Sequence, residues 1–254
     1  MLTSHGDVTQ LIEHAHTVRT EAQCDLVIAN DLKLGLGRKF FVTPTGWWEG
    51  KTEDVAMAAA WIHEIKQGGF YRSKATLNVS LKEHLKEWAL AERLWDRIEP
   101  YWERCDDLLH GCFAVRLPEG FITTRRGKRQ GSGNDPLAHV RRVDHDDRSV
   151  WVDPGLIKAT LNAPMLDRIF ETNPHVNVIV HLHRALKKAR TEPYIPPGTV
   201  AEAELGQHVP FLDGNSLDPI GVNIQGHGSV VGFRTTDLNE IMTFVKDGRN
   251  WQWE

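Results

Sequence analysis

Two histidines lie two residues apart at the end of an apolar, β-branched run, residues 177–184 (NVIVHLHR). On a strand, side chains at positions i and i+2 point to the same face, so His181 and His183 would present both imidazoles together. Imidazole binds zinc and neighbouring divalent ions well, but two ligands are too few for a metal site. His227, flanked by glycines in QGHGS, is the candidate third ligand, because missing side chains let another strand approach closely. The alternative is the ordinary polar end of a surface strand.

Alternating helices and strands would position these histidines. A helix is predicted from about residue 163 to 171, directly before the strand VNVIVHL. The third histidine falls in a glycine-interrupted strand, residues 219–233, and a last helix is expected over 237–245. CFAVRL and GFITT, further upstream, are also strand-like. This alternation predicts the α/β class.

The segment before these strands carries a helix-start signal. Ser80 and Glu83 form an S-x-x-E capping box, which predicts a helical stretch that continues to about Leu109 and is divided at Pro100. A polar loop follows the strand GFITT, and its basic residues, Lys128 among them, lie between glycines without interleaved aromatic side chains. We interpret this basic cluster as a solvated loop.

The N-terminal segment predicts a helix (VTQLIEHAHTVRTEAQ), a buried strand (CDLVIAN), a short strand (KFFVT), the turn-rich PTGWWEGKT and a helix over about 53–66. This order indicates part of an open, Rossmann-like α/β sheet. Its first strand ends at Asn30 and Asp31, which fits a nucleotide-like crevice at the carboxyl end of an open-sheet strand; a plain turn is the alternative. The domain boundary is placed near residue 76, giving segments 1–75 and 76–254.

Composition limits the partners. The 254 residues carry a formal net charge of -4, so no basic field favours nucleic acid. No run approaches the roughly 18 to 20 apolar residues of a membrane span, and no secretory signal is visible. Three cysteines without metal-type spacing make a disulfide framework improbable. We therefore expect a cytoplasmic protein that binds a small molecule, with no nucleic-acid or membrane partner.

From about residue 80 onward the sequence resembles the class II aldolase/adducin family. NPHVNVIVHLHR resembles the helix end and H-x-H strand of that family, PYIPPGT its proline-rich loop, and NIQGHGSVVGF its strand with N-H-G. GCFAVRL and GFITT stand where the family has G-N-x-S-x-R and I-T-P-S-G. The resemblance implies an α/β/α domain and a homo-oligomer, a tetramer in the family. It also implies a divalent ion, zinc first, on His181, His183 and His227, which polarises substrate oxygens and stabilises an enediolate.

The resemblance also has departures. The stretch ATLN, residues 159–162, stands where the family has P-S-S-E, so the acid/base glutamate becomes Asn162, whose amide cannot take up a proton at neutral pH. Thr123, Thr124 and Thr160 are the hydroxyl groups expected at the substrate or its phosphate. Other nearby carboxylates are interpreted as solvated surface charges; they are Asp167, Glu171, Glu202 and Glu204. We therefore expect weak or no aldolase activity on sugar phosphates.

Residues 8–70 resemble the C-terminal part of phosphopantothenoylcysteine synthetase, through the first helix, DLVIAND with its glycine-containing loop, and TEDVAMAAAWIHEI. That ligase takes part in coenzyme A synthesis. The loop does not match a phosphate-binding fingerprint, so we expect no nucleotide binding. A segment this short buries little of its surface and should dock on the rest of the chain, on a second copy or on another partner.

The sequence thus predicts an enzyme, a divalent-metal-dependent lyase of the aldolase type or an isomerase relative, acting on a small hydroxy-carbonyl compound, phosphorylated or not. The first alternative is a non-catalytic metal-binding or interaction module of the same fold, as in the adducin branch. A remnant of a coenzyme A biosynthesis fusion protein is the second. Asn162 favours the first alternative, whereas three convergent imidazoles would favour the enzyme.

Overall fold

The structure of the chain is a computed structural model. The described residues are 7–30, 37–43, 46–52, 54–76, 84–105, 108–128, 136–153, 158–212, 214 and 219–252. Contacts between residues divide the chain into two units, Met1–Gly68 and Gly69–Glu254.

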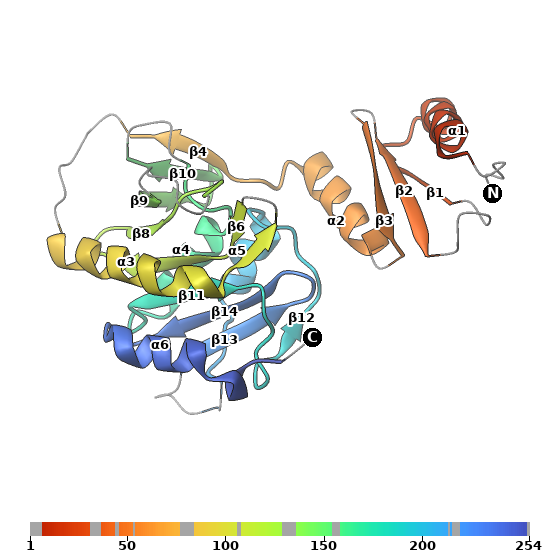
Figure 1. Cartoon of the computed structure of the whole chain (residues 1–254). Coiled ribbons are helices and arrows are strands. Elements are labelled where there is room, and N and C mark those ends of the chain that lie inside the picture. Colours follow the sequence, from red (N-terminus) through yellow and green to blue (C-terminus); the bar gives the residue numbers. More distant parts are fainter. Residues whose placement is uncertain are drawn as a thin grey trace. The chain divides into compact units, whose positions relative to one another are not determined.

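The first unit combines two helices with a three-stranded antiparallel sheet (Figure 1). Its elements are α1 (Val8–Glu21), β1 (Val27–Ala29), β2 (Arg38–Thr43), β3 (Gly46–Lys51) and α2 (Asp54–Gln67). Asp7 caps α1 by accepting from the backbone N–H of Thr9 at 2.8 Å. The apolar face of α1 packs with β1 and β2 into a small core; its buried residues are Leu11, Ile12, Ala15, Ala29, Phe40 and Val42.

Two expectations for this unit were wrong. The segment interpreted as turn-rich contains β3, in which Trp48 pairs opposite Phe41 and the two rings stack at 5.1 Å. The pairing also differs from a Rossmann-like segment, because β1 and β2 are antiparallel, with Val27 opposite Val42. An open Rossmann-like sheet instead pairs parallel strands through helical crossovers.

The second unit is built on a mixed sheet. Among the described residues nine strands form it, in the order β12-β13-β14-β11-β7-β8-β9-β10-β4. All neighbours are antiparallel except the outermost pairs, β12 with β13 and β10 with β4. The strands are β4 (Arg72–Ala75), β7 (Cys112–Arg116), β8 (Phe121–Thr124), β9 (Leu137–Asp144), β10 (Ser149–Val152), β11 (Val178–Leu182), β12 (Thr191–Glu192), β13 (Ile220–Ile224) and β14 (Gly228–Phe233).

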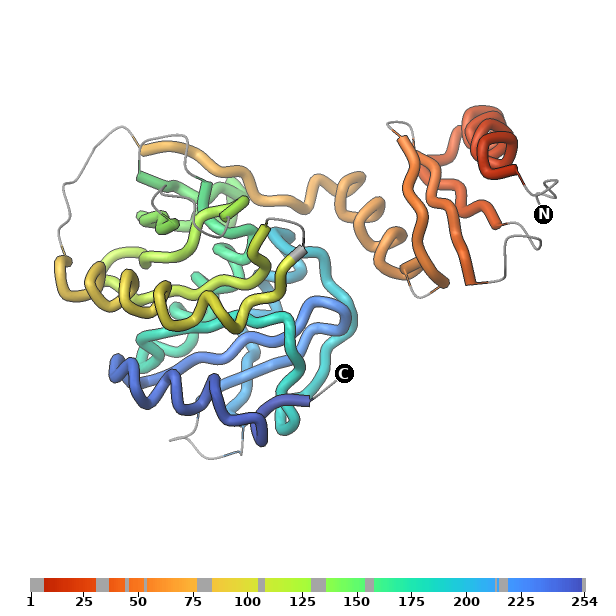
Figure 2. The backbone as a smooth tube through the Cα atoms, viewed as in Figure 1, coloured from red at the N-terminus to blue at the C-terminus, as the bar shows by residue number. Residues whose placement is uncertain are grey.

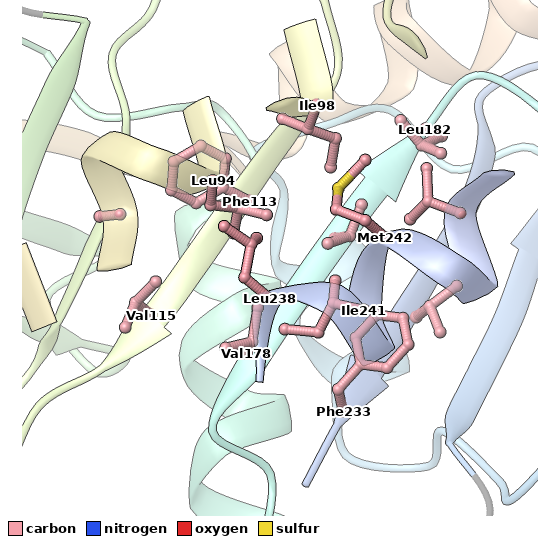
Figure 3. Close-up of a cluster of buried hydrophobic side chains, with 14 of the residues drawn as sticks. Leu94, Ile98, Phe113, Val115, Val178, Leu182, Phe233, Leu238, Ile241 and Met242 are labelled. Carbon is pink, nitrogen blue, oxygen red and sulfur yellow. The ribbon is translucent and has the colours of Figure 1, made fainter. Parts of the chain in front are cut away.

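Helices cover both faces of this sheet, which gives the expected α/β/α layers. α3 (Leu85–Ile98) and α6 (Leu238–Lys246) lie on one face, as Figures 1 and 2 show. Figure 3 shows the core beneath them, where Leu94 and Ile241 meet Phe113 of β7. α4 (Ala163–Thr172) and α5 (Val200–Gly206) pack on the opposite face. Successive residues of β7 alternate between the two cores, as strand geometry requires.

The segment between α3 and β7 differs from the long helix expected there. α3 ends at Ile98, and a 3-10 turn, η1 (Glu99–Tyr101), contains Pro100, so the proline divides the helix as predicted. The chain then forms a short hairpin of β5 (Glu103–Cys105) and β6 (Leu108–His110) instead of continuing as helix to Leu109. The capping box, Ser80 with Glu83, lies outside the described residues.

The unit boundary lies earlier than residue 76. Residues 72–75 form β4 and pair in parallel with β10, so they belong to the sheet of the second unit. β9 and α5 were not anticipated. Within the part of the chain that the structure describes, no helix is long and apolar enough to cross a membrane.

Candidate metal centre

Three histidines come together at one end of the strands β11 and β14. His181 is the fourth residue of β11, where its backbone is paired with Val230 of β14 on one side and Cys112 of β7 on the other. His183 follows one residue beyond the end of β11, and His227 lies in the turn that joins β13 to β14. Strand order therefore brings a distant histidine beside the H-x-H pair.

Gly228 allows the turn to approach β11. Its φ is +92°, and a Cβ at this position would lie 2.2 Å from the carbonyl oxygen of Leu182 and 2.5 Å from the Cα of His183. Any side chain would therefore push the turn, and His227 with it, away from the pair. This is the close approach that the flanking glycines of QGHGS predict.

The three rings form one cluster. Their centroids are 4.8 Å apart for His181 and His227, 5.1 Å for His181 and His183, and 5.6 Å for His183 and His227. One nitrogen from each ring can be chosen so that all three lie within 4.8 Å of one another. Tetrahedral zinc holds nitrogens about 3.4 Å apart, so the rings must draw together by on the order of 1 Å to share an ion.

Hydrogen bonds select which nitrogens remain available. The Nδ1 of His181 lies 2.9 Å from the carbonyl oxygen of Ser229, which can only accept, so Nδ1 carries the proton. The Nδ1 of His183 lies 2.6 Å from the Glu103 carboxylate. In both rings Nε2 is therefore the free lone pair, and a carboxylate or carbonyl behind a ligand histidine is the usual arrangement at metal sites.

Burial keeps these imidazoles neutral. Burial, followed by the neighbouring His227 and His183, lowers the pKa of His181 well below its usual value. Burial also lowers the pKa of His227 to about 4, and that of His183 falls even though Glu103 acts in the opposite direction. Neutral imidazole is the form that binds a metal ion, so the cluster is ready to bind at neutral pH without releasing protons.

The donor set fits a divalent ion. Among the described residues, the Nε2 of His181 and the Nδ1 of His227 are buried without a hydrogen-bond partner. Nothing among the described residues bonds either nitrogen, and an unprotonated imidazole nitrogen offers a lone pair that can bind a divalent ion. Three imidazoles suit zinc and its neighbours, and three protein ligands leave a coordination position open for substrate.

A fourth histidine, which the sequence analysis missed, lies beside the cluster. The ring of His110 is 5.7 Å from that of His183, and its Nε2 is also buried without a partner among the described residues. His110 ends β6, in the hairpin that was expected to be helix, so no strand geometry pointed to it.

Asn162 lies one side chain away from His181. Its Oδ1 is 3.8 Å from the thiol sulfur of Cys112, the residue opposite His181 in the sheet. The Thr160 hydroxyl donates to the same oxygen at 3.2 Å. Its Nδ2 donates to the carboxylate of Glu202 at 2.6 Å. The amide thus links the sheet next to the histidines with a carboxyl group on α5.

The interpretation of Glu202 as a solvated charge was wrong. The residue is 0% exposed, and its second carboxylate oxygen accepts from the backbone N–H of Gly198 at 2.6 Å. Burial raises the pKa of Glu202 to about 8, although both hydrogen bonds act in the opposite direction. Asp167 is also mostly buried, but it bonds the Nε2 of His145 at 3.0 Å. Glu171 pairs with Arg168 at 2.8 Å.

The structure does not gather the three predicted threonine hydroxyls at the histidines. Register places Thr124 opposite Leu137, on the face covered by α3, whereas His181 lies on the other face with Cys112. The Thr123 hydroxyl donates to the backbone oxygen of Phe113 at 2.5 Å. Thr160 is the member of the set beside the site, through its bond to Asn162.

Lys128 is buried, which corrects its interpretation as part of a solvated loop. Its ammonium donates to the carbonyl oxygen of Gly111, the residue before Cys112, and lies 4.8 Å from the ring of Trp102. Burial lowers the pKa of Lys128 to about 8, so the amine still carries a proton at neutral pH. A cation therefore stands beside the strand segment that faces His181.

In the first unit, the predicted nucleotide-like crevice is described in part. Asn30 is exposed, and its Oδ1 accepts from the ammonium of Lys39. Asp31 lies outside the described residues. This exposed amide is thus bonded to Lys39 of the neighbouring strand β2.

No protein-family model and no curated protein matches this chain. Among solved structures, it is similar to L-fuculose-1-phosphate aldolase of Thermus thermophilus (15% identity, 66% of this chain and 93% of that one, TM-score 0.39). It is also similar to a sugar-phosphate aldolase of Thermotoga maritima, with 17% identity over 64% of this chain and 93% of that one and a TM-score of 0.43. For an aldolase II superfamily protein of Pseudomonas syringae, the identity is 15% over 66% of this chain and 73% of that one, and the TM-score is 0.45. These comparisons give no support to the resemblance of residues 8–70 to phosphopantothenoylcysteine synthetase.

Proposed function

We propose that this chain is a divalent-metal-dependent lyase of the aldolase type, or an isomerase relative, acting on a small hydroxy-carbonyl compound. One observation carries the proposal: His181, His183 and His227 converge, and buried nitrogens of this cluster lack a partner among the described residues. A packing role explains a single buried histidine, but three neutral imidazoles with free lone pairs are a ligand set. Zinc is the proposed ion.

The residues around the ion would have different roles. His181, His183 and His227 would hold it, with Ser229 and Glu103 fixing the first two rings in the ligating tautomer. When bound, such an ion supplies Lewis-acid polarisation of a carbonyl and its neighbouring hydroxyl. The Lys128 ammonium adds positive charge beside Cys112, which favours a substrate with an anionic group such as a phosphate.

Metal analysis of the purified protein tests this proposal. We expect about one equivalent of zinc or a related ion per chain, and its loss in His183→Ala. His208→Ala is the matched control, because His208 is an exposed histidine and should leave the content unchanged. Equal metal content in both variants, or none in the unaltered protein after zinc is added, would exclude the proposed site.

Activity then separates the enzyme from a non-catalytic module. Turnover on the order of 1 to 1000 per second on a hydroxy-carbonyl substrate would establish the lyase. A protein that binds the ion in full and shows no turnover or proton exchange on such compounds would instead be the interaction module that Asn162 favours.

A further inference from the structure

Glu202 is a buried carboxyl group whose burial needs an explanation. It is 0% exposed, and within the described residues no lysine, arginine or histidine pairs with it. Its two oxygens accept from Asn162 Nδ2 and from the N–H of Gly198, each at 2.6 Å. A buried carboxyl without a cationic partner is unfavourable, and an apolar side chain would pack there at lower cost.

Helix capping does not account for this carboxyl. Thr199 caps α5, and its hydroxyl oxygen accepts from the backbone N–H of Glu202 at 3.2 Å. That bond uses only the backbone of residue 202, so any residue type would preserve it. The carboxylate bond to Gly198 fixes the turn before α5, and a neutral glutamine amide has an oxygen that can accept the same bond.

The carboxyl group lies next to the proposed metal centre. Glu202 bonds Asn162, the amide oxygen of Asn162 contacts Cys112, and Cys112 is paired in the sheet with His181. Removing a proton from the carbon beside a carbonyl requires a base, and the three histidines are already committed as ligands. Lys128, the other buried titratable group next to Cys112, is held as a hydrogen-bond donor to Gly111.

We propose that Glu202 is the acid/base carboxyl of this site. This inference rests on the proposed function. The ionised carboxylate takes a proton from the carbon beside the substrate carbonyl and becomes a carboxylic acid. The electron pair of the broken C–H bond moves into the carbonyl and leaves an enediolate. Returning the proton to carbon regenerates the carboxylate, so no further reactant is needed.

Asn162 lies between this carboxyl and Cys112. Its Nδ2 donates the shorter bond, 2.6 Å, to the carboxylate. The contacts on the other side of the amide are longer, 3.2 Å to the Thr160 hydroxyl and 3.8 Å to the Cys112 sulfur. Substrate that enters beside Cys112 replaces the amide as the partner of Glu202.

Deuterium exchange tests the role of the carboxyl separately from the metal. Zinc-loaded protein is incubated in deuterium oxide with dihydroxyacetone or its phosphate, and loss of the carbon-bound proton signals is followed by NMR. Glu202→Gln keeps the side-chain shape and should slow exchange by about 100- to 10,000-fold, with zinc affinity unchanged. Glu204→Gln, two residues away and exposed, is the matched control and should exchange at the original rate.

A carboxyl moved to the neighbouring position supplies the decisive readout. Asn162→Glu combined with Glu202→Gln should recover most of the lost exchange, because position 162 lies between Glu202 and Cys112; a purely structural role of Glu202 would not be rescued. Asn162→Glu alone places two carboxyls in contact, which then share one proton, and should not raise the rate.

The outcomes separate the two proposals. If the unaltered protein exchanges and Glu202→Gln exchanges equally fast, Glu202 is not the acid/base. The same follows if Glu202→Gln is slow and the double variant does not recover the exchange. Both outcomes leave the lyase proposal in place. Zinc-loaded unaltered protein that exchanges neither probe overturns the lyase proposal and the role of Glu202 with it.

Discussion

Replacing Gly228 by alanine should separate His227 from the other two histidines. The added Cβ would lie 2.2 Å from the Leu182 oxygen, whereas such contacts essentially never fall below 3.0 Å, so the turn must retreat by about 0.8 Å. Metal–ligand distances tolerate only about 0.2 Å of change. Zinc binding should therefore weaken by more than the roughly 10- to 100-fold that outer partners of ligands contribute.

Gly214 offers a control that isolates the steric effect from backbone strain. Its φ is +70°, and a Cβ there would meet nothing within 4 Å. Gly214→Ala should cost about 1 to 2 kcal/mol from the left-handed backbone alone and leave zinc affinity unchanged. Gly228→Ala should cost a further 1 to 3 kcal/mol, roughly the usual penalty for overpacking.

Calorimetric zinc titration and urea unfolding, each on both variants, measure the two quantities. If Gly228→Ala binds zinc as tightly as Gly214→Ala, then His227 is not a ligand or the turn does not position it. If the two variants have the same free energy of unfolding, the turn does not lie as close to β11 as described.

Two further changes probe the carboxylates around the site. Glu103→Gln should weaken zinc binding by about 10- to 100-fold, because His183 loses a charged partner. The control Glu119→Gln, on the surface, should bind zinc as the unaltered protein does. Equal zinc affinities of the two variants would contradict the role of Glu103. The pKa of Glu202 is about 8 in the folded protein against an ordinary value of 4.5, so folded chains keep a proton that unfolded chains release. The free energy of unfolding of the unaltered protein should therefore fall, relative to that of Glu202→Gln, as the pH rises from 4.5 to 8. Urea unfolding of both proteins at these two pH values measures it. If the two free energies differ by the same amount at both pH values, the pKa of Glu202 is not raised.

Strong local patterns predicted the elements that hold the site. The β-branched run before His181 forms β11 with all five residues buried, and the glycine-interrupted segment forms β13 and β14 around His227. These residues favour strands and also fill the core, so local preference and packing agree. The α/β class followed from the same patterns, whereas the α/β/α layers were expected from the resemblance to the class II aldolase/adducin family.

Elements with weak local patterns were missed because tertiary pairing determines them. β9 contains charged residues and becomes a strand only between β8 and β10. β5 and β6 are three residues each and stabilise one another as a hairpin. Glu202 shows why some site residues cannot be predicted from the sequence. The sequence gives its position along the chain relative to the histidines. Its burial depends on how α5 packs against α4 and on the turn at Gly198.

Strand order explains why the predicted ligand set lies in one place. β14 is hydrogen-bonded directly to β11, with Ser229 opposite Leu182, so the turn before β14 must lie beside the end of β11. The Ser229 carbonyl then accepts from His181, which fixes both the ring and the register. An ion held by His181, His183 and His227 would join the end of β11 to the β13–β14 turn. Its binding free energy would therefore add to the stability of the sheet centre, and the sheet in turn holds the ligands in position.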